Sequence, residues 1–151
     1  MSDSRPETWE HINHVRRYLN MIITDLMSRA ELHDLSKLAT PEIETFDEYT
    51  DKLSTTVYGS EDYFGYLAAM QPALVHHYAH NEHHPQFHDN GVGDMHLGQL
   101  VEMLCDWKAA TLRNKNGDLR RSIVLGRERF GYGEEIERLL LNTAEAFGWV
   151  Q

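Results

Sequence analysis

The stretch INHVRRYLNMIITDL, residues 12–26, carries its apolar side chains at steps of three and four residues. An α-helix has about 3.6 residues per turn, so these steps place the side chains on one face of a helix. The apolar residues on this face are Ile12, Val15, Leu19, Ile22, Ile23 and Leu26. The pattern predicts an amphipathic helix from Glu7 to about Ala30.

Further helix patterns follow, separated by residues that favour turns and caps. They are expected at about residues 40–53, 63–70, 73–84, 97–114, 118–129 and 135–147. Thr40 is expected to cap the first of these, with Pro41 at the first helical position, and Ser60 and Asp118 are expected to cap later helices. Pro72 either opens the histidine-rich helix or kinks a continuous one. Because no pair of strands is predicted, the fold class is all-α, a compact bundle of six or seven helices.

Length and charge limit the partners of this chain. It has 151 residues, of which 41% are hydrophobic, enough for one core and for a single domain over residues 1–151. The formal net charge of -10 argues against an extended nucleic-acid partner, because such binding needs many Lys and Arg side chains against phosphates. A small anionic substrate held by a metal is compatible with this charge.

The single cysteine, Cys105, excludes an internal disulfide and a zinc cluster built on cysteines. Any metal is therefore expected to use nitrogen and oxygen ligands, and the chain is expected to be cytoplasmic. No apolar run approaches the roughly 20 residues that span a bilayer, and the first residues lack the apolar region of a signal peptide. No membrane partner is expected.

The string His33-Asp34-Leu35-Ser36-Lys37 brings chemically active groups together. Imidazole nitrogen and carboxylate oxygen form a mixed ligand set that suits Zn, Mn, Fe, Co or Mg, according to geometry. Neighbours on a regular helix point about 100° apart, so a metal can bridge His33 and Asp34 at a helix end. A surface turn with Asp34 as a helix cap is the simpler alternative. Lys37 lies one turn after His33, where its ammonium group can reach a phosphate oxygen of a metal-bound substrate.

Two further candidate ligands lie outside this string. His11 lies at the edge of the apolar face of the first helix, where packing is its alternative role, whereas His14 is turned toward solvent. Asp106 lies in the most apolar helix of the second half, and a carboxylate near a core is unfavourable unless it is paired or bound to a metal. An ion pair with Lys108 or Arg113 is the alternative for Asp106.

Most of the ten histidines lie between residues 76 and 96. If the helix continues through this run, His77 and His84 share one face, and His76 and His83 share a second. We expect the row of His77 and His84 to lie nearer the core and to belong to the site, with His83 as the alternative. A polar, solvated helix face and adventitious metal binding are the simpler explanations of the run.

The order of His11, His33-Asp34 and Asp106 resembles the H, HD, D pattern of the HD-domain superfamily of metal-dependent phosphohydrolases. The string HDLSK resembles the HD-x-x-K string of its cyclic-dinucleotide-cleaving branch. Ser36 replaces the glycine before the lysine, however, and the further GYP motif is absent, so cyclic-dinucleotide cleavage is not implied. Nearly the whole chain is also similar to a small HD-like family of bacterial and bacteriophage genomes, through HDxSK, HHxxxNxHHP (residues 76–85) and EMLCDW (residues 102–107).

The superfamily resemblance implies a set of site residues and a cofactor. The ligands of a first metal would be His11, His33, Asp34 and Asp106. A second metal or the substrate phosphate would be held by His77 together with His84 or His83. The catalytic residues would be Lys37, Asp106, His77 and His84, with Lys37 binding phosphate and Asp106 or a histidine steering the proton. One or two divalent ions, Mn, Fe, Co, Zn or Mg, are the expected cofactor.

The expected function is hydrolysis of a phosphate ester or anhydride of a small molecule, with a nucleotide as the favoured substrate. A bound metal lowers the pKa of its water and so supplies the attacking hydroxide. Two alternatives use the same residues: a di-iron oxygenase on an HD-like scaffold, and a non-catalytic protein that binds a metal or a nucleotide. Aromatic residues such as Trp9, Tyr63 and Phe64 leave room for a homodimer.

Overall fold

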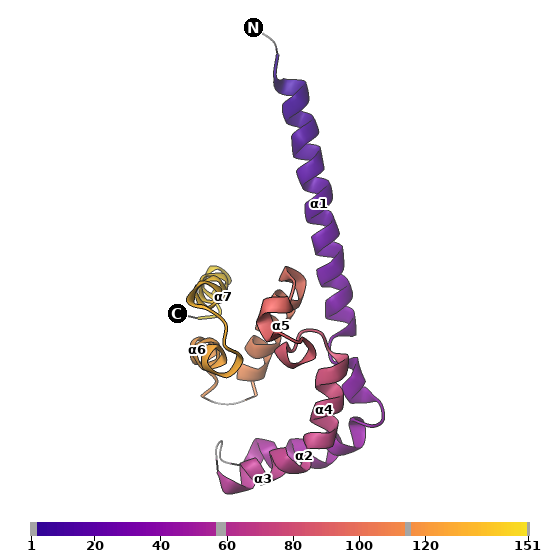
Figure 1. Ribbon diagram of the computed structural model, residues 1–151, viewed down its shortest axis with the longest axis vertical. Coiled ribbons are helices and arrows are strands. Elements are labelled where there is room, and N and C mark those ends of the chain that lie inside the picture. The colour runs from indigo at the N-terminus through magenta and orange to yellow at the C-terminus, as the bar shows by residue number, and fades with distance from the viewer. Residues whose placement is uncertain (1–2, 57–59, 114–115, 151) are drawn as a thin grey trace. The chain divides into compact units, whose positions relative to one another are not determined.

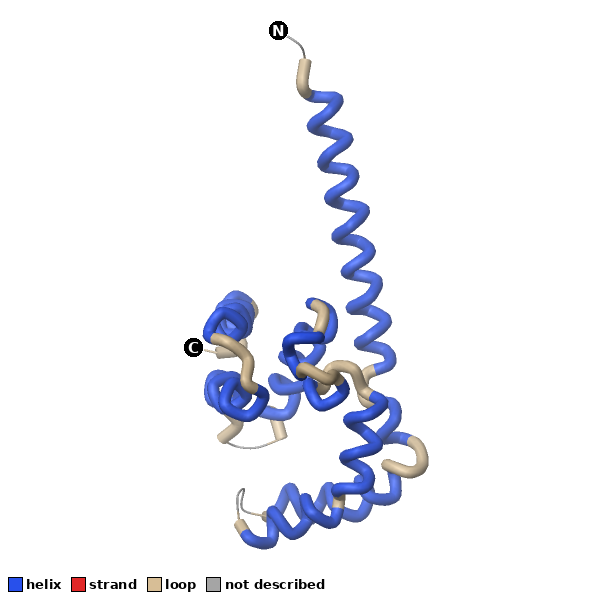
Figure 2. The backbone as a smooth tube through the Cα atoms, in the orientation of Figure 1, coloured by secondary structure: helices blue, strands red, loops and turns tan. Residues whose placement is uncertain are grey.

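The computed structural model describes residues 3–56, 60–113 and 116–150. Within these ranges all regular structure is helical and no strand occurs, as Figure 2 shows. The fold is therefore all-α, as predicted, with seven α-helices among the described residues (Figure 1). They are α1 (Arg5–Leu32), α2 (Ile43–Thr55), α3 (Glu61–Ala69), α4 (Gln71–His80), α5 (Leu97–Thr111), α6 (Leu119–Phe130) and α7 (Glu134–Ala146). Short 3₁₀ helices lie between some of them: η1 (Leu35–Leu38), η2 (Pro85–Phe87) and η3 (Gly91–Asp94).

The chain divides into two compact units, Met1–His33 and Asp34–Gln151. The first unit consists mainly of α1, the long helix that the apolar pattern of residues 12–26 predicted. Some apolar side chains of α1, such as Trp9 and Leu19, are exposed. No described helix is both long enough and apolar enough to cross a membrane. The prediction of a single domain over residues 1–151 stays a prediction.

The hydrophobic core of the second unit lies among α5, α6 and α7 (Figure 1). Its buried residues are Val92, Leu100, Met103, Leu104, Leu119, Ile123, Tyr132, Leu140 and Ala144. Gly126 of α6 lets the Trp107 ring approach closely, because a Cβ at Gly126 would lie 2.5 Å from that ring. The buried Tyr132 hydroxyl donates to the carbonyl of Ile123, and burial raises the pKa of this phenol above its usual value. These contacts join α5 to α6 and hold the segment that leads to α7 against α6.

The helix starts follow the predicted caps at two of three positions. Ser60 accepts a hydrogen bond from the Tyr63 amide, and Asp118 accepts one from the Arg121 amide, as predicted. The predicted start at Thr40 is wrong, because α2 begins only at Ile43. A turn over residues 39–42 precedes this helix, closed by the amide of residue 42 on the carbonyl of residue 39 at 3.0 Å.

The histidine-rich helix is shorter than predicted. Pro72 lies in the first turn of α4 and so opens a new helix, but α4 ends at His80 rather than at His84. Asn81 takes extended dihedral angles, and its side-chain amide donates to the carbonyl of His77 at 2.8 Å, where a continuing helix would place a backbone amide. His83 and His84 therefore lie beyond the helix. The prediction that they extend two faces of one helix is wrong. For α5, the predicted end at residue 114 lies outside the described residues.

Candidate metal centre

Four of the predicted site residues meet in the second unit: Asp34, His77, His83 and His84. Each offers a donor atom, and the four donors lie within 4.8 Å of one another. Asp34 precedes η1, His77 lies in α4, and the other two histidines lie in the turn between α4 and η2. His77 and His83 are buried, with 1% and 2% of their surfaces exposed, while Asp34 and His84 are half-buried. The cluster can hold a metal ion.

The donor atoms converge at distances that suit shared coordination. His77 Nε2 lies 2.8 Å from His84 Nε2 and 3.2 Å from Asp34 Oδ1, and His83 Nε2 lies 3.5 Å from the same oxygen. Two ligands that each lie about 2.1 Å from one ion at a right angle are about 3 Å apart. One carboxylate and three imidazoles also form the mixed oxygen and nitrogen set that divalent transition metals accept. The residues therefore fit a metal ion of this class.

Asp34 reaches the cluster because of an unusual backbone conformation. Its φ of 57° is left-handed, a region that Asp and Asn tolerate better than most residues. The chain then enters η1, where the Lys37 amide donates to the Asp34 carbonyl at 2.9 Å. The Lys37 ammonium also pairs with the second carboxylate oxygen of Asp34, Oδ2. Asp34 thus directs Oδ1 toward the histidines and Oδ2 toward Lys37.

Two glutamates that the sequence analysis did not select support the histidines. Glu42 is completely buried, and its Oε2 lies 2.9 Å from Nδ1 of His77. Oε1 of Glu102, in α5, lies 3.2 Å from Nδ1 of His83. In both histidines the other ring nitrogen, Nε2, is the one near Asp34. Metal-binding histidines commonly present one nitrogen to a carboxylate and the other to the ion. The cluster has this arrangement twice.

The surroundings set the charge of two groups in the cluster. Burial lowers the pKa of His84 to about 3, and the nearby rings of His83 and His77 contribute to this shift. His84 is therefore neutral near pH 7 and can offer a nitrogen lone pair. Burial alone would raise the pKa of the Glu42 carboxyl, but hydrogen bonds, above all from His76, hold it below its usual value. Glu42 is therefore an anion near pH 7, in contact with the rings of His76 and His77.

Of the remaining predicted site residues, Asp106 and Lys37 belong to the second unit, and His11 and His33 belong to the first. Asp106 offers a carboxylate oxygen within 4.8 Å of a donor atom of Asp34, and Lys37 pairs with Asp34 as described. His11 is exposed on α1, and His33 ends the first unit. The ligand roles of His11 and His33 stay predictions.

The sequence carried a signal for one of the two supporting glutamates. Glu102 precedes Asp106 by four residues in a predicted helix, so both point to the same side. Glu42 had no comparable signal, because an acidic residue in the first turn of a predicted helix is explained by the helix dipole. Its role depends on the histidines of α4, which lie far away in the sequence.

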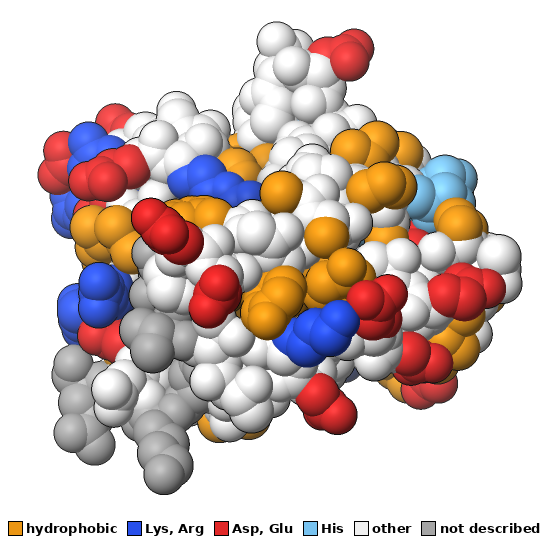
Figure 3. Space-filling view, turned by 90° about the horizontal axis from the view of Figure 1, so that it is seen from below, with side chains coloured by type: hydrophobic (Ala, Val, Ile, Leu, Met, Phe, Trp, Pro, Cys, Tyr) orange, Lys and Arg blue, Asp and Glu red, His pale blue; other side chains and the backbone are white. Residues whose placement is uncertain are grey.

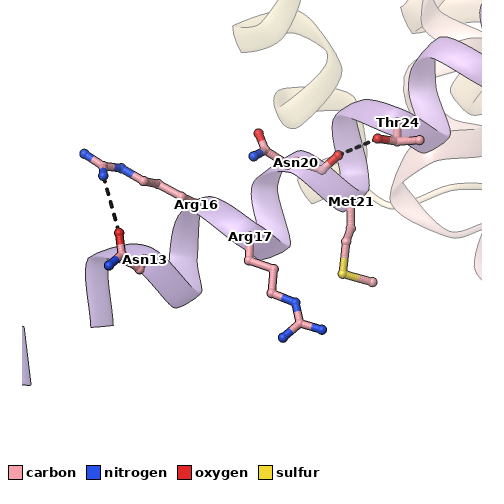
Figure 4. A pocket seen from close by; sticks show the side chains of 6 residues that line it. All are labelled: Asn13, Arg16, Arg17, Asn20, Met21 and Thr24. Carbon is pink, nitrogen blue, oxygen red and sulfur yellow. Dashed lines mark hydrogen bonds between the residues drawn. The ribbon is translucent and has the colours of Figure 1, made fainter. Parts of the chain in front are cut away.

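A shallow depression runs along α1, but its residues are not suited to metal binding. Figure 4 shows the six side chains that line it, all from the same helix: Asn13, Arg16, Arg17, Asn20, Met21 and Thr24. Arg16 donates to the Asn13 side chain at 3.4 Å, and the Thr24 hydroxyl donates to the Asn20 carbonyl at 2.9 Å. No carboxylate or imidazole lines it, so we place the candidate site at the histidine cluster.

A protein-family model described as "Family of unknown function (DUF5662)" matches residues 1–147, nearly the whole chain. No curated protein matches the chain, and no solved structure matches it. The helical fold and the cluster of histidine and aspartate are compatible with the HD-like metal site that the motifs predicted. The chemistry of the cluster is therefore the basis on which a function can be argued.

Proposed function

The chain belongs to the family of unknown function DUF5662, and we propose that it is a metal-dependent phosphohydrolase acting on a small phosphorylated molecule. The observation that carries this proposal is the convergence of one carboxylate and three imidazoles on a common point beside a lysine. Phosphate hydrolysis needs an activated water and positive charge near the phosphate oxygens. A metal at the cluster and the ammonium of Lys37 would meet these two needs.

The ligands of the ion would be Asp34, His77, His83 and His84. A divalent ion bound there would supply an acidified water and neutralise phosphate charge. Lys37 is held beside the cluster by Asp34, and its ammonium lies 5.3 Å from the centre of the Phe46 ring. Its side chain is 27% exposed, so we assign it the phosphate of an entering substrate. Asp106 is the candidate for holding the proton that the attacking water releases.

The charge of the chain favours a small substrate. On the face that Figure 3 shows, acidic side chains are spread widely, and Lys and Arg side chains form small separate groups. A long polyanion would meet repulsion from the net charge of -10, whereas a single phosphate needs only a local positive group. A nucleotide is the substrate that we favour within this class.

Metal content and phosphatase activity of matched variants test the proposal. We expect Asp34→Asn and His84→Ala to lose bound metal and to hydrolyse p-nitrophenyl phosphate and nucleoside 5′-phosphates at least about 100-fold more slowly. The controls are Asp47→Asn and His80→Ala, which make the same chemical changes at exposed positions of α2 and α4. Full metal content and activity in both site variants would overturn the proposal. His11→Ala and His33→Ala test the two predicted ligands of the first unit.

The alternative functions give different results in the same experiments. Iron-dependent absorbance with oxygen consumption, and no phosphate release, would identify a di-iron oxygenase. Tight nucleotide binding without product after long incubation would identify a non-catalytic binding protein. Either result would replace the phosphohydrolase proposal while keeping the metal centre.

A further inference from the structure

Glu42 is the most deeply buried carboxylate of the cluster, and both of its oxygens are used. Its side chain has no exposed surface. Oε1 lies 2.7 Å from Nδ1 of His76, and Oε2 lies 2.9 Å from Nδ1 of His77 and 3.0 Å from the Ser36 hydroxyl. An anion is stable in such a place only when hydrogen-bond donors surround it. The neighbouring groups must therefore present hydrogens to Glu42.

The hydrogen bonds around Glu42 are satisfied by one arrangement of protons. The side-chain amide of Asn81 has two hydrogens, which go to the His77 carbonyl and to Ser36 Oγ, each at 2.8 Å. Ser36 then donates its own hydrogen to Glu42. His77 donates from Nδ1 to Glu42, since an unprotonated Nδ1 would place a lone pair against a carboxylate oxygen. His77 therefore carries a proton on Nδ1, and Nε2 is the ring nitrogen that it presents to the cluster.

Nε2 of His77 faces the cluster, where it lies 3.2 Å from Asp34 Oδ1 and 2.8 Å from His84 Nε2. Glu102 orients His83 in the same way. It lies 3.2 Å from Nδ1 of that ring, and Nε2 is then the nitrogen near Asp34. The two glutamates come from different elements and approach their histidines independently. Both rings are thus held with the ligand nitrogen pointing to the common point.

We infer that Glu42 and Glu102 are positioning residues that fix the tautomer and orientation of His77 and His83 for metal binding. This inference rests on the metal centre of the proposed function, but not on the reaction that takes place there. A glutamate that only fills space could be replaced by leucine without effect on the ion. A glutamate that only supplies negative charge could not be replaced by glutamine.

Two substitutions at Glu42 separate these roles. Glu42→Leu removes the acceptor, so Nδ1 of His77 can accept from Ser36 or Asn81 and the ring proton moves to Nε2, where it blocks the ion. Glu42→Gln keeps one acceptor oxygen for His77, while its amide nitrogen can donate to His76, a partly exposed ring that is free to take the other tautomer. We expect the first change to weaken metal binding about 10-fold to 100-fold and the second to weaken it only a few-fold.

The experiment is a titration of the metal-free full chain with Co²⁺ and Zn²⁺, followed by visible absorption and calorimetry. Glu44→Gln and Glu44→Leu are the matched controls, because Glu44 is exposed and lies two residues further along the chain, in the first turn of α2. The histidine tautomers are read in the metal-free proteins from ring ¹⁵N chemical shifts. We expect Nδ1–H at His77 in the wild type and in Glu42→Gln, and Nε2–H in Glu42→Leu.

The outcomes decide between the three roles. Wild-type affinity in Glu42→Leu would overturn the inference, and so would equal loss in the leucine and glutamine variants. If Glu42→Leu does not fold, Glu102→Leu applies the same test to His83 at a site with 11% side-chain exposure. Absence of phosphatase activity in the wild type would remove the proposed function but leave these results unaffected. A His77 ring without a proton on Nδ1 in the metal-free wild type would overturn the inference without reference to any metal.

Discussion

The region around α5, α6 and α7 and the region around α4 are filled by different kinds of side chain. The first buries mainly apolar residues, among them Met103 and Ile123, both with no exposed surface. The second buries Glu42, His77 and His83 and holds them with hydrogen bonds and ion pairs. Apolar burial is favourable in itself, whereas buried polar groups are favourable only when all their partners are present.

Within the second unit, the apolar core is therefore expected to provide stability, and the histidine cluster is expected to provide the functional site. The apolar core should fold without any ligand, because nothing in it depends on an ion. The histidine cluster brings three imidazoles and several carboxylates close together, and a bound cation would balance them. We expect the stability of the α4 region to depend on the metal and that of the core to be independent of it.

The largest effect is expected from a cavity in the core. Met103→Ala removes a fully buried side chain and should lower the free energy of unfolding by about 2–5 kcal/mol. Urea denaturation followed by circular dichroism measures this change. Leu112→Ala is the control, because Leu112 is 78% exposed. A Met103→Ala protein that keeps its stability but loses metal affinity would break the comparison, since the two regions would then not be separate.

Withdrawal of the metal is expected to have the next largest effect. An ion present at 100 times its dissociation constant adds about 2.7 kcal/mol to the free energy of unfolding, and a chelator removes this contribution. Hydrogen exchange should locate the loss, with faster amide exchange over residues 34–42 and 76–84 and unchanged exchange over residues 119–144. Equal acceleration in both regions would show that the ion stabilises the unit as a whole.

The smallest effect on stability is expected from the loss of one buried hydrogen bond within the apolar core. Tyr132→Phe removes the hydroxyl that donates to the Ile123 carbonyl and should lower the free energy of unfolding by about 1 kcal/mol. Tyr18→Phe on α1 serves as the control, because Tyr18 is 60% exposed. Metal affinity should be the same in both variants. A change in metal affinity on Tyr132→Phe would show that the core and the cluster are coupled.

Local sequence signals predicted most of the helices. The caps at Ser60 and Asp118 were predicted because a side chain that accepts from an amide three residues on needs only its own segment. The helix end at His80 was missed because no glycine or proline marks it before Pro85. There the amide of Asn81 competes with the backbone for a carbonyl, and composition alone does not reveal such competition.

The candidate site was predicted in part. Asp34, His77, His83 and His84 were selected from the sequence, and the structure brings them together. His83 and His84 were expected to reach His77 along one continuous helix, but the turn after α4 brings them back to it.

The sequence by itself determined most of the helices, the all-α class and the residue types available to bind a metal, because each depends on the order of side chains along the chain. Only the tertiary structure decided which donors meet and which nitrogen of each ring faces the cluster. Glu42 lies 35 residues before His77, and Ser36 lies 45 residues before Asn81. Contacts across such separations depend on how helices pack, and packing is a property of the whole unit rather than of any local pattern.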